Sequence, residues 1–256
     1  MWEIYDMLIS GIPEDIKVVD VIVGLRWTMA RTDTNAGLAM TVNETTAPTN
    51  FKHVIVDAPL KEAAALVKSW NFVEAGIGLA AINAYYNSKE AIIKNASGLS
   101  VQTEWDASDE NCFESYKGII KCKKVAVIGH FKNIETYLSS CNEVCILERK
   151  PGPGDYPDTA CEYLLPGRDY VFITGSAFIN KTMPRLLEIS KGSKIILAGP
   201  SVPLAPLLFQ YGACDLSGFV VVNQTYCRRA ICEGNIMPLF ESGKRVRLYK
   251  RLEERK

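Results

Sequence analysis

Five short apolar runs in the second half of the chain constrain its fold more than any other feature. Each run is rich in β-branched residues, and helix-like segments at 133–140, 181–190 and 203–211 separate several of them. Strands that are apolar on both faces and alternate with helices are typical of a parallel sheet. We therefore predict a doubly wound α/β sheet with the strands KVAVIG (124–129), EVCILE (143–148), DYVFITG (169–175), SKIILAG (193–199) and SGFVVVN (217–223).

The segments around these strands are less regular. The second crossover, RKPGPGDYPDT, reads as a loop and not as a helix. Residues 224–234 are expected to form a last helix and KRVRLYK a final strand. The basic segment 243–256 also fits a solvated tail, since runs of charge are usually solvated.

The first half has a different pattern, with an amphipathic helix at 1–10 followed by a hairpin. Apolar residues alternate with others through VIVGLRWTMARTD (21–33), which predicts one strand with a buried face. The turn residues TDTNAG and the returning strand LAMTV complete the β-hairpin. The segment DAPLKEAAALVKS then predicts a helix with Asp57 as its N-cap.

The segment SWNFVEAGIGLAAINAYYN (69–87) is apolar on nearly every side and too short to cross a membrane, so it predicts a central buried helix. Gly76 and Gly78 weaken a helix, and we expect them to allow close approach of another element. Asn71 and Glu74 have the spacing of a capping box. Glu74 is therefore either a capping residue or a functional one.

Residues 96–120 are polar and rich in turn formers, which predicts a linker. The expected organisation is an α+β domain over 1–95, this linker, and the parallel-sheet domain over 121–256.

Composition narrows the function classes. The 29 basic and 29 acidic residues balance, which disfavours a nucleic-acid or membrane-surface partner. No apolar stretch reaches the roughly 18 residues of a membrane span, and the acidic N-terminus lacks the features of a signal peptide. We expect a cytoplasmic protein. Its eight cysteines lack metal-site spacing and are expected to be mostly reduced and buried.

Ligands of open parallel sheets bind at the carboxyl ends of the strands. Four turns lie there, and three of them combine glycine with a hydroxyl or an imidazole before a helix, where free N–H groups attract anions. The candidate ligand-binding residues at these ends are Gly129, His130, Phe131, Glu148, Thr174, Gly175, Ser176, Asn180, Gly199, Pro200 and Ser201.

The first of these turns lacks the glycines of a dinucleotide site. Residues 129–134 read GHFKNI, so a standard NAD site is disfavoured. Glu148 nevertheless follows Gly129 at the spacing of a ribose-binding acid, which leaves an adenosyl ligand open. His130 could bind a metal or carry a proton, whereas His53 is expected on the surface.

Two loops carry further candidates. The Gly/Pro-rich segment 150–163 follows the Glu148 strand and could be a lid, with Asp155 and Tyr156 as its polar groups. The proline-stiffened segment 199–206 presents Ser201. Either loop could also be only structural.

Several long strings together resemble the putative heavy-metal chelation family, which was formerly a domain of unknown function. They are MWEIYDMLISGIP, KSWNFVEAGIGLAAINAYYN, VAVIGHF, GDYP, DYVFITGSAFINKTMPRLLEIS and GPSVPLAPLLFQYG. The resemblance implies an enolase-N-terminal-like first domain, a Rossmann-like second domain and a site between them. The matching positions include Glu74 and Asn83 on the central helix and the turns at 129–131, 174–176 and 199–201.

The leading hypothesis is a binding protein or enzyme that takes a small polar ligand, a heavy-metal ion or a metal-associated small molecule in an interdomain cleft. His130 and Glu74 are the candidate metal ligands. A methyltransferase-like enzyme with an adenosyl cofactor and a non-catalytic assembly subunit are the alternatives. The oligomeric state is open, with a homodimer as one option. The strand order is also open, and a 2-1-3-4-5 order would bring the turns at 129, 174 and 199 together.

Overall fold

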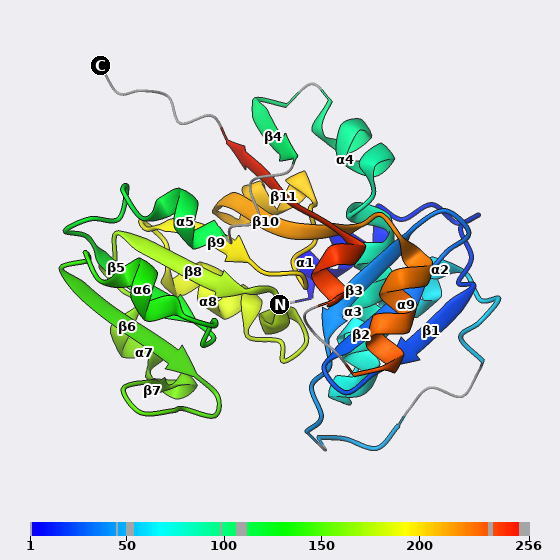
Figure 1. Ribbon diagram of the computed structural model, residues 1–256, viewed down its shortest axis with the longest axis horizontal. Helices are drawn as coiled ribbons and strands as arrows, with labels where there is room; N and C mark the ends of the chain where they lie inside the picture. Colours follow the sequence, from blue (N-terminus) through cyan, green and yellow to red (C-terminus); the bar gives the residue numbers. More distant parts are fainter. Residues whose placement is uncertain are drawn as a thin grey trace.

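The computed structural model describes residues 2–44, 46–49, 54–97, 99–105, 112–234 and 238–250 and confirms an α/β fold. An eight-stranded sheet fills one side of the molecule, and a three-stranded sheet with a central helix fills the other (Figure 1). All five predicted strands form. They are β5 (Lys124–Ile128), β6 (Glu143–Glu148), β8 (Tyr170–Thr174), β9 (Lys194–Ala198) and β10 (Ala213–Val221).

The large sheet has the order β4-β11-β10-β9-β8-β5-β6-β7, in which β7 is Tyr156–Pro157. The strands from β10 to β7 are parallel, whereas β11 (Gly243–Lys250) and β4 (Val101–Trp105) add antiparallel partners at one edge. Counted along the chain, the five predicted strands have the 2-1-3-4-5 order. The chain reverses direction across the sheet between β5 and β8, and the turns after β5, β8 and β9 are therefore neighbours.

Short helices connect the strands, and the second crossover contains one that the sequence does not predict. It consists of a 3-10 turn, η2 (Asp158–Ala160), followed by α7 (Cys161–Leu164). The expected last helix and final strand both form, as α9 (Gln224–Cys232) and β11. The other connections are α6 (Ile134–Leu138), η3 (Gly175–Phe178), α8 (Met183–Ile189), η4 (Pro206–Tyr211) and η5 (Pro238–Ser242).

The first half begins with the expected helix, α1 (Glu3–Ser10), but its first predicted strand is wrong. Instead of one strand over 21–33, β1 (Asp20–Val23) and β2 (Trp27–Arg31) pair as a hairpin, and β3 (Ala36–Met40) pairs with β2. The Gly24 amide donates to the Trp27 carbonyl at 3.0 Å and closes the turn. The alternation of apolar residues continues through this turn, so periodicity alone does not reveal it.

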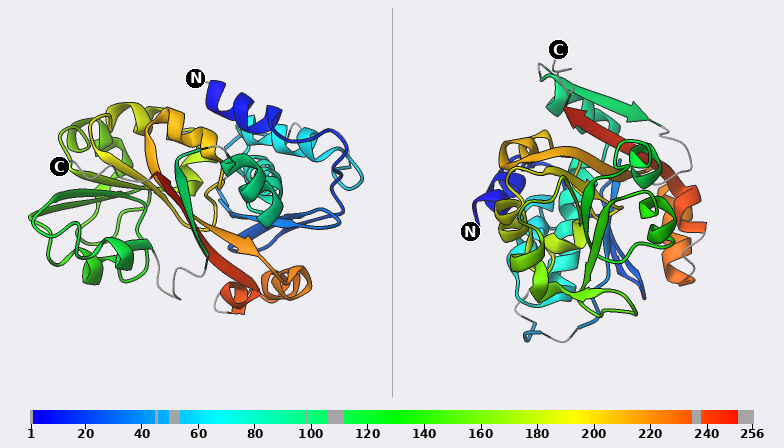
Figure 2. Two further views of the ribbon diagram at one scale, coloured as in Figure 1. Left: turned by 90° about the horizontal axis from the view of Figure 1, so that it is seen from above. Right: turned by 90° about the vertical axis from the view of Figure 1, so that its left-hand side faces the viewer.

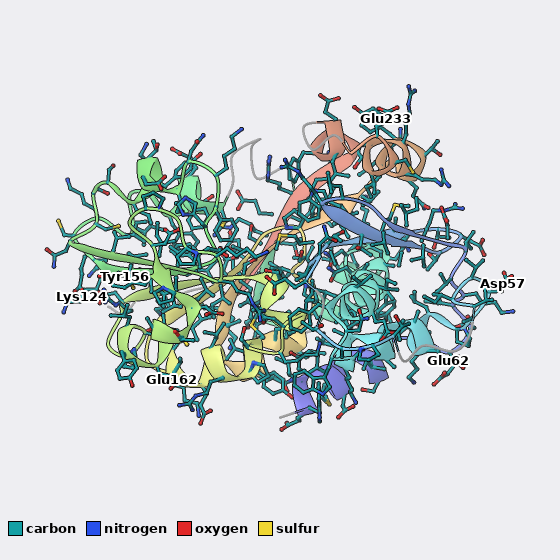
Figure 3. All side chains as sticks on the ribbon, turned by 90° about the horizontal axis from the view of Figure 1, so that it is seen from below. Asp57, Glu62, Lys124, Tyr156, Glu162 and Glu233 are labelled. Carbon is teal, nitrogen blue, oxygen red and sulfur yellow. The ribbon has the colours of Figure 1, made fainter. Side chains whose placement is uncertain are left out.

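The next helix, α2 (Leu60–Ala65), starts later than predicted, and Asp57 is not its N-cap. Asp57 lies outside the helix with a φ of 69°, and its amide donates to the Val18 carbonyl at 2.8 Å. Pro59 occupies the cap position without a side-chain hydrogen bond. Asp57 and Glu62 lie at the end of the molecule opposite Lys124 and Tyr156 (Figure 3). A 3-10 turn, η1 (Leu66–Lys68), follows α2.

The central helix, α3 (Phe72–Tyr86), confirms the prediction for 69–87, since every residue except Val73 is buried. The Asn71 side chain caps it by accepting from the amides of Val73 and Glu74. A Cβ added to Gly78 would lie 2.0 Å from the Val67 nitrogen of η1, so this glycine does allow close approach. Gly76 is different, because its added Cβ would meet nothing nearer than 3.7 Å.

A buried asparagine at the end of α3 connects it to the large sheet. The Asn87 amide donates to the carbonyls of Val202 and Phe219 at 2.9 and 3.2 Å and accepts from the Leu204 amide at 2.8 Å. Its side chain thus replaces backbone partners for the segment after β9. The helix α4 (Lys89–Ala96) follows directly, with Ser88 as its cap.

The sequence predicts a linker over residues 96–120. The residues of this range that the structure describes contribute to the large sheet. This range contains β4, which pairs with β11, and α5 (Cys112–Tyr116), which packs on the sheet through Phe113 and Tyr116. Figure 2 shows β4 and β11 side by side. His53, expected on the surface, lies outside the described residues. Among the described helices, none is long and apolar enough to cross a membrane.

The two glycines of α3 predict opposite effects on stability. Gly76→Ala should raise the free energy of unfolding by about 0.5–1 kcal/mol, because alanine favours a helix and the added methyl group has room. Gly78→Ala should lower it by about 1–3 kcal/mol, because the methyl group would overlap the backbone of η1. Chemical denaturation of both variants measures the difference, and equal effects would contradict the packing described here.

Candidate functional site

A cavity of about 1570 Å³ lies at the carboxyl ends of the parallel strands. Its floor is formed by the turns after β5, β8 and β9. The order in which the chain adds strands to the sheet reverses at this point. Its other walls come from β2, the segment after β3, α5, β10 and β11. Small-molecule sites usually have about 300–1,000 Å³, so this cavity has room for a cofactor-sized molecule or for a smaller one with water.

Most of the predicted binding residues meet at this cavity. The predicted residues that line it are Gly129, His130, Phe131, Glu148, Thr174, Ser176, Asn180, Gly199, Pro200 and Ser201. Gly129 and Gly199 have φ values of 95° and 103°, which other residues rarely adopt. Gly175 is not part of the lining. Its added Cβ would lie 2.5 Å from the Ser201 carbonyl carbon, so it allows two of the turns to touch.

Four amides of these turns donate within the protein and are therefore not the free donors that the sequence predicts. The Gly129 amide donates to the Leu147 carbonyl at 2.8 Å, and the Gly199 amide donates to the Ser217 carbonyl at 2.9 Å. The amides of His130 and Ser176 also donate within the protein, to Glu148 and to the Thr174 hydroxyl. The turns therefore offer side-chain groups to a ligand, among them the paired hydroxyls of Thr174 and Ser176, which lie 3.0 Å apart.

Glu148 has a structural task at the end of β6. One carboxylate oxygen accepts from the His130 amide at 2.8 Å, and the other accepts from the amides of Arg149 and Lys150 at 2.8 and 3.3 Å. A ribose would have to share these oxygens. The carboxylate holds the turn after β5 to the end of β6.

His130 is held between two carboxylates. Its Nδ1 lies 2.9 and 3.0 Å from the two oxygens of Asp155, whose side chain is only 3% exposed. Its Nε2 lies 3.2 Å from Glu135 on α6. The hydrogen bond to Asp155 is the main reason that the pKa of His130 is raised above 6.5, and the charges of Asp155, Glu135 and Glu148 add to it. Asp155, a polar candidate of the predicted lid, is thus the partner of His130.

Two groups of aromatic side chains form walls of the cavity, and of their members the sequence analysis identifies only Phe131. Phe113 contacts Phe131 and Tyr137, with ring centroids 5.0 and 6.2 Å apart. Across the lining, Phe240 contacts Trp27 and Phe219 at 6.2 and 5.8 Å. The second group comes from three distant segments, so no local spacing in the sequence could indicate it.

The two polar residues of the central helix lie outside the lining. Glu74 accepts a hydrogen bond from the Ser69 hydroxyl. The Asn83 amide is fully buried and donates to the Leu38 carbonyl of β3 at 2.7 Å. Of the two predicted metal ligands, only His130 lines the cavity. A ligating role for Glu74 stays a prediction.

Charged side chains also connect the two halves at the cavity. Glu44, after β3, pairs with Arg149 at 3.2 Å and with Lys150 at 3.4 Å. Arg149 also stacks over the ring of Phe72, at the start of α3. Because these side chains are partly exposed, each pair contributes little to stability, about 1 kcal/mol or less.

The eight cysteines are free thiols, but only Cys112, Cys145 and Cys227 are buried, so the expectation that most of them are buried is wrong. Cys112 and Cys161 line the cavity, and burial raises the pKa of the Cys112 thiol to about 12, which keeps it protonated and unreactive. Within the described residues, no group of three or more His, Cys, Asp or Glu side chains is arranged to hold a metal ion.

Comparisons with known proteins define the class. Two family models, both described as putative heavy-metal chelation, match residues 5–86 (DUF4213) and 111–250 (DUF364). A DUF364 protein of unknown function from Desulfitobacterium hafniense has a crystal structure with 40% sequence identity and a TM-score of 0.88, covering 98% of this chain and 99% of that one.

More distant relatives agree. An uncharacterised protein of Methanocaldococcus jannaschii is 31% identical over 232 residues, which are 84% of this chain and 83% of that protein. A DUF364 structure from Pyrococcus horikoshii, 24% identical, has the same fold with a TM-score of 0.78 and covers 95% of this chain and 97% of that one. The chain belongs to the DUF364 family, as its motifs predict. The likeness of its first half to the enolase N-terminal fold stays a prediction.

Ser201 predicts a structural effect. Its buried hydroxyl accepts from the Met40 amide of β3 at 2.8 Å. Ser201→Ala should lower the free energy of unfolding by about 0.5–1.5 kcal/mol, because it removes the partner of a partly buried amide. Ser176→Ala is the matched control and should cost less, since the Thr174 hydroxyl keeps its bond from the Ser176 amide. Denaturant unfolding of both variants tests this difference.

Asp155 predicts a titration effect. In Asp155→Asn the pKa of His130 should fall toward 6.5, because the variant removes the hydrogen bond and the charge that favour the imidazolium. The raised pKa stabilises the fold at low pH, and this contribution is lost as the pH rises through the folded-state pKa. NMR titration measures the pKa, with Glu233→Gln as a control (Figure 3). An unchanged pKa in Asp155→Asn would refute the assignment.

Proposed function

We propose that the protein binds an organic small molecule in the cavity, with a flat apolar part between the aromatic walls and a polar part at the strand ends. The observation that carries this proposal is the cavity itself, at the point of the sheet where ligands of doubly wound folds bind. The chemistry of its lining then indicates the class of ligand.

The lining supports a ligand with two different ends. Aromatic faces attract flat rings by stacking, worth about 0.5–1.5 kcal/mol for each pair. The hydroxyls of Thr174 and Ser176 and the imidazole of His130 offer hydrogen bonds at the floor. An apolar wall with polar groups that fix the orientation of the ligand is typical of small-molecule sites.

Metal chelation fits this proposal when the ligand is itself a chelator. The described side chains provide no set of three metal ligands, so they would not enclose a bare ion. A metal bound by an organic molecule needs fewer protein donors. This agrees with the description of both family models as putative heavy-metal chelation, and the interdomain cleft that the resemblance implies would then hold a metal-associated small molecule.

The adenosyl-cofactor alternative has less support. The position that would hold a ribose belongs to Glu148, whose oxygens already accept three backbone amides. Adenosyl compounds therefore serve as competitors in the binding test.

The test combines native mass spectrometry of the freshly purified chain, elemental analysis of the same sample, and a binding assay. We expect a co-purified molecule that denaturation releases. The probe is anilinonaphthalene sulfonate, an aromatic anion whose fluorescence rises in apolar sites. Phe131→Ala and Phe240→Ala should each weaken its binding about 3- to 10-fold through lost stacking.

The control is Tyr163→Ala, which removes an aromatic ring that is 86% exposed and lies outside the lining. Its affinity for the probe should equal that of the wild type. Equal affinities in all three variants, together with a bare apo mass, would refute the cavity as a binding site.

A further inference from the structure

His130 and its partner Asp155 differ sharply in their exposure to solvent. The imidazole is only half-buried, with its side chain 35% exposed, yet the carboxylate behind it is almost completely buried. Burying a carboxylate costs free energy unless hydrogen bonds compensate for it. Asp155 meets this condition with the imidazole on one side and the Gly152 amide, at 2.9 Å, on the other.

Asp155 determines which nitrogen of His130 is available. A carboxylate only accepts hydrogen bonds, so Nδ1 must carry the hydrogen that points to Asp155. Nε2 faces the Glu135 carboxylate, so by the same argument it also carries a hydrogen, which a metal ion would replace to reach the electron pair of Nε2. The carboxylate partner at Nδ1 is the usual companion of a histidine that binds a metal through its other nitrogen.

The second donor is Glu135, five residues after His130. Its carboxylate oxygen lies 3.2 Å from His130 Nε2. Metal–ligand bonds to imidazole and carboxylate are about 2.0–2.2 Å long, which places neighbouring donors of one ion about 3.0–3.5 Å apart. The two atoms thus already have the spacing of adjacent ligands on one ion.

We infer that His130 Nε2 and the Glu135 carboxylate bind a divalent transition-metal ion at the rim of the cavity, with Asp155 as the residue that positions the imidazole. The ion is of the class that imidazole and carboxylate share, such as Zn²⁺ or Co²⁺. Two protein donors leave coordination positions open. This inference rests on the proposed function in one respect, that the open positions are filled by a chelating ligand of the cavity, or otherwise by water.

The pairing differs from the one that the sequence predicts. The Glu74 carboxylate accepts from the Ser69 hydroxyl. Glu74 and Glu135 both lie outside the lining, but the Glu135 carboxylate already lies 3.2 Å from His130. Glu148 is close to His130, but its oxygens accept backbone amides. The Glu135 side chain is 65% exposed and contacts the His130 imidazole through its carboxylate. Its reorientation to bind an ion would therefore cost little free energy.

The experiment titrates the full-length chain with Zn²⁺ by calorimetry and records the visible spectrum with Co²⁺, which separates nitrogen and oxygen ligands from thiolates. His130→Ala and Glu135→Gln should each raise the dissociation constant at least tenfold. Asp155→Asn, which keeps the shape of the side chain, should raise it about 10- to 100-fold, as expected for a lost partner of a metal-binding histidine.

Glu233→Gln is the matched control. Like Glu135, Glu233 is an exposed glutamate with one cationic partner, here Arg229, and it is the C-cap of α9. Its dissociation constant should equal that of the wild type. Equal affinity in His130→Ala or in Glu135→Gln would overturn the site, and thiolate bands in the Co²⁺ spectrum would assign the ion to cysteines instead. An unchanged affinity in Asp155→Asn would overturn the positioning role.

A second titration separates this inference from the proposed function. Picolinate, a flat aromatic chelator, is added to the Zn²⁺-loaded chain and to Phe131→Ala. If Zn²⁺ binds but picolinate has the same affinity for the Zn²⁺-loaded wild type and for Phe131→Ala, the metal site stands and the proposed ligand class fails. If picolinate binds equally well without metal and in Glu135→Gln, the ligand class stands and the metal site fails.

Discussion

The close contact between α3 and its neighbours determines where every other part of the first half can lie. The backbone of α3 touches η1 at Gly78, and β3 touches α3 at Gly37, whose added Cβ would lie 2.0 Å from the Ala84 nitrogen. Contacts between backbones leave no freedom for side chains to adjust. Asn87 then connects the end of the same helix to the segments after β9 and within β10. As a result, β3 lies beside the carboxyl edge of the large sheet, and the cavity is enclosed between them.

The turn after β5 lacks the glycines of a dinucleotide-binding turn, and its hydrogen bonds explain why it does not need them. Dinucleotide-binding turns need several glycines because their free amides must approach a pyrophosphate. Here the His130 amide donates to Glu148, and both Gly129 and Asn133 have a left-handed backbone. What the turn presents to the cavity is an imidazole and an aromatic ring, which suit a different class of ligand from a nucleotide.

The sequence predicts the parts of the fold whose pattern is local. The five buried strands and the apolar helix α3 are confirmed because each repeats one signal over many residues. The single strand predicted over 21–33 and the predicted N-cap role of Asp57 are wrong, because single turns depend on tertiary contacts. For the site, the strand ends are predictable from fold rules. The aromatic wall of Trp27, Phe219 and Phe240 and the partnership of Asp155 with His130 are not, because these residues are distant in the chain.

The position of β4 affects how the protein can be divided. The DUF364 model begins at residue 111, whereas β4 comes before it and pairs with β11 along Val101–Trp105. A fragment cut at that boundary would leave β11 as an open edge with unpaired backbone groups. Such edges invite pairing with other chains. Removing the segment between the two matched regions would therefore expose a surface that could join β11 of one fragment to a strand of the next.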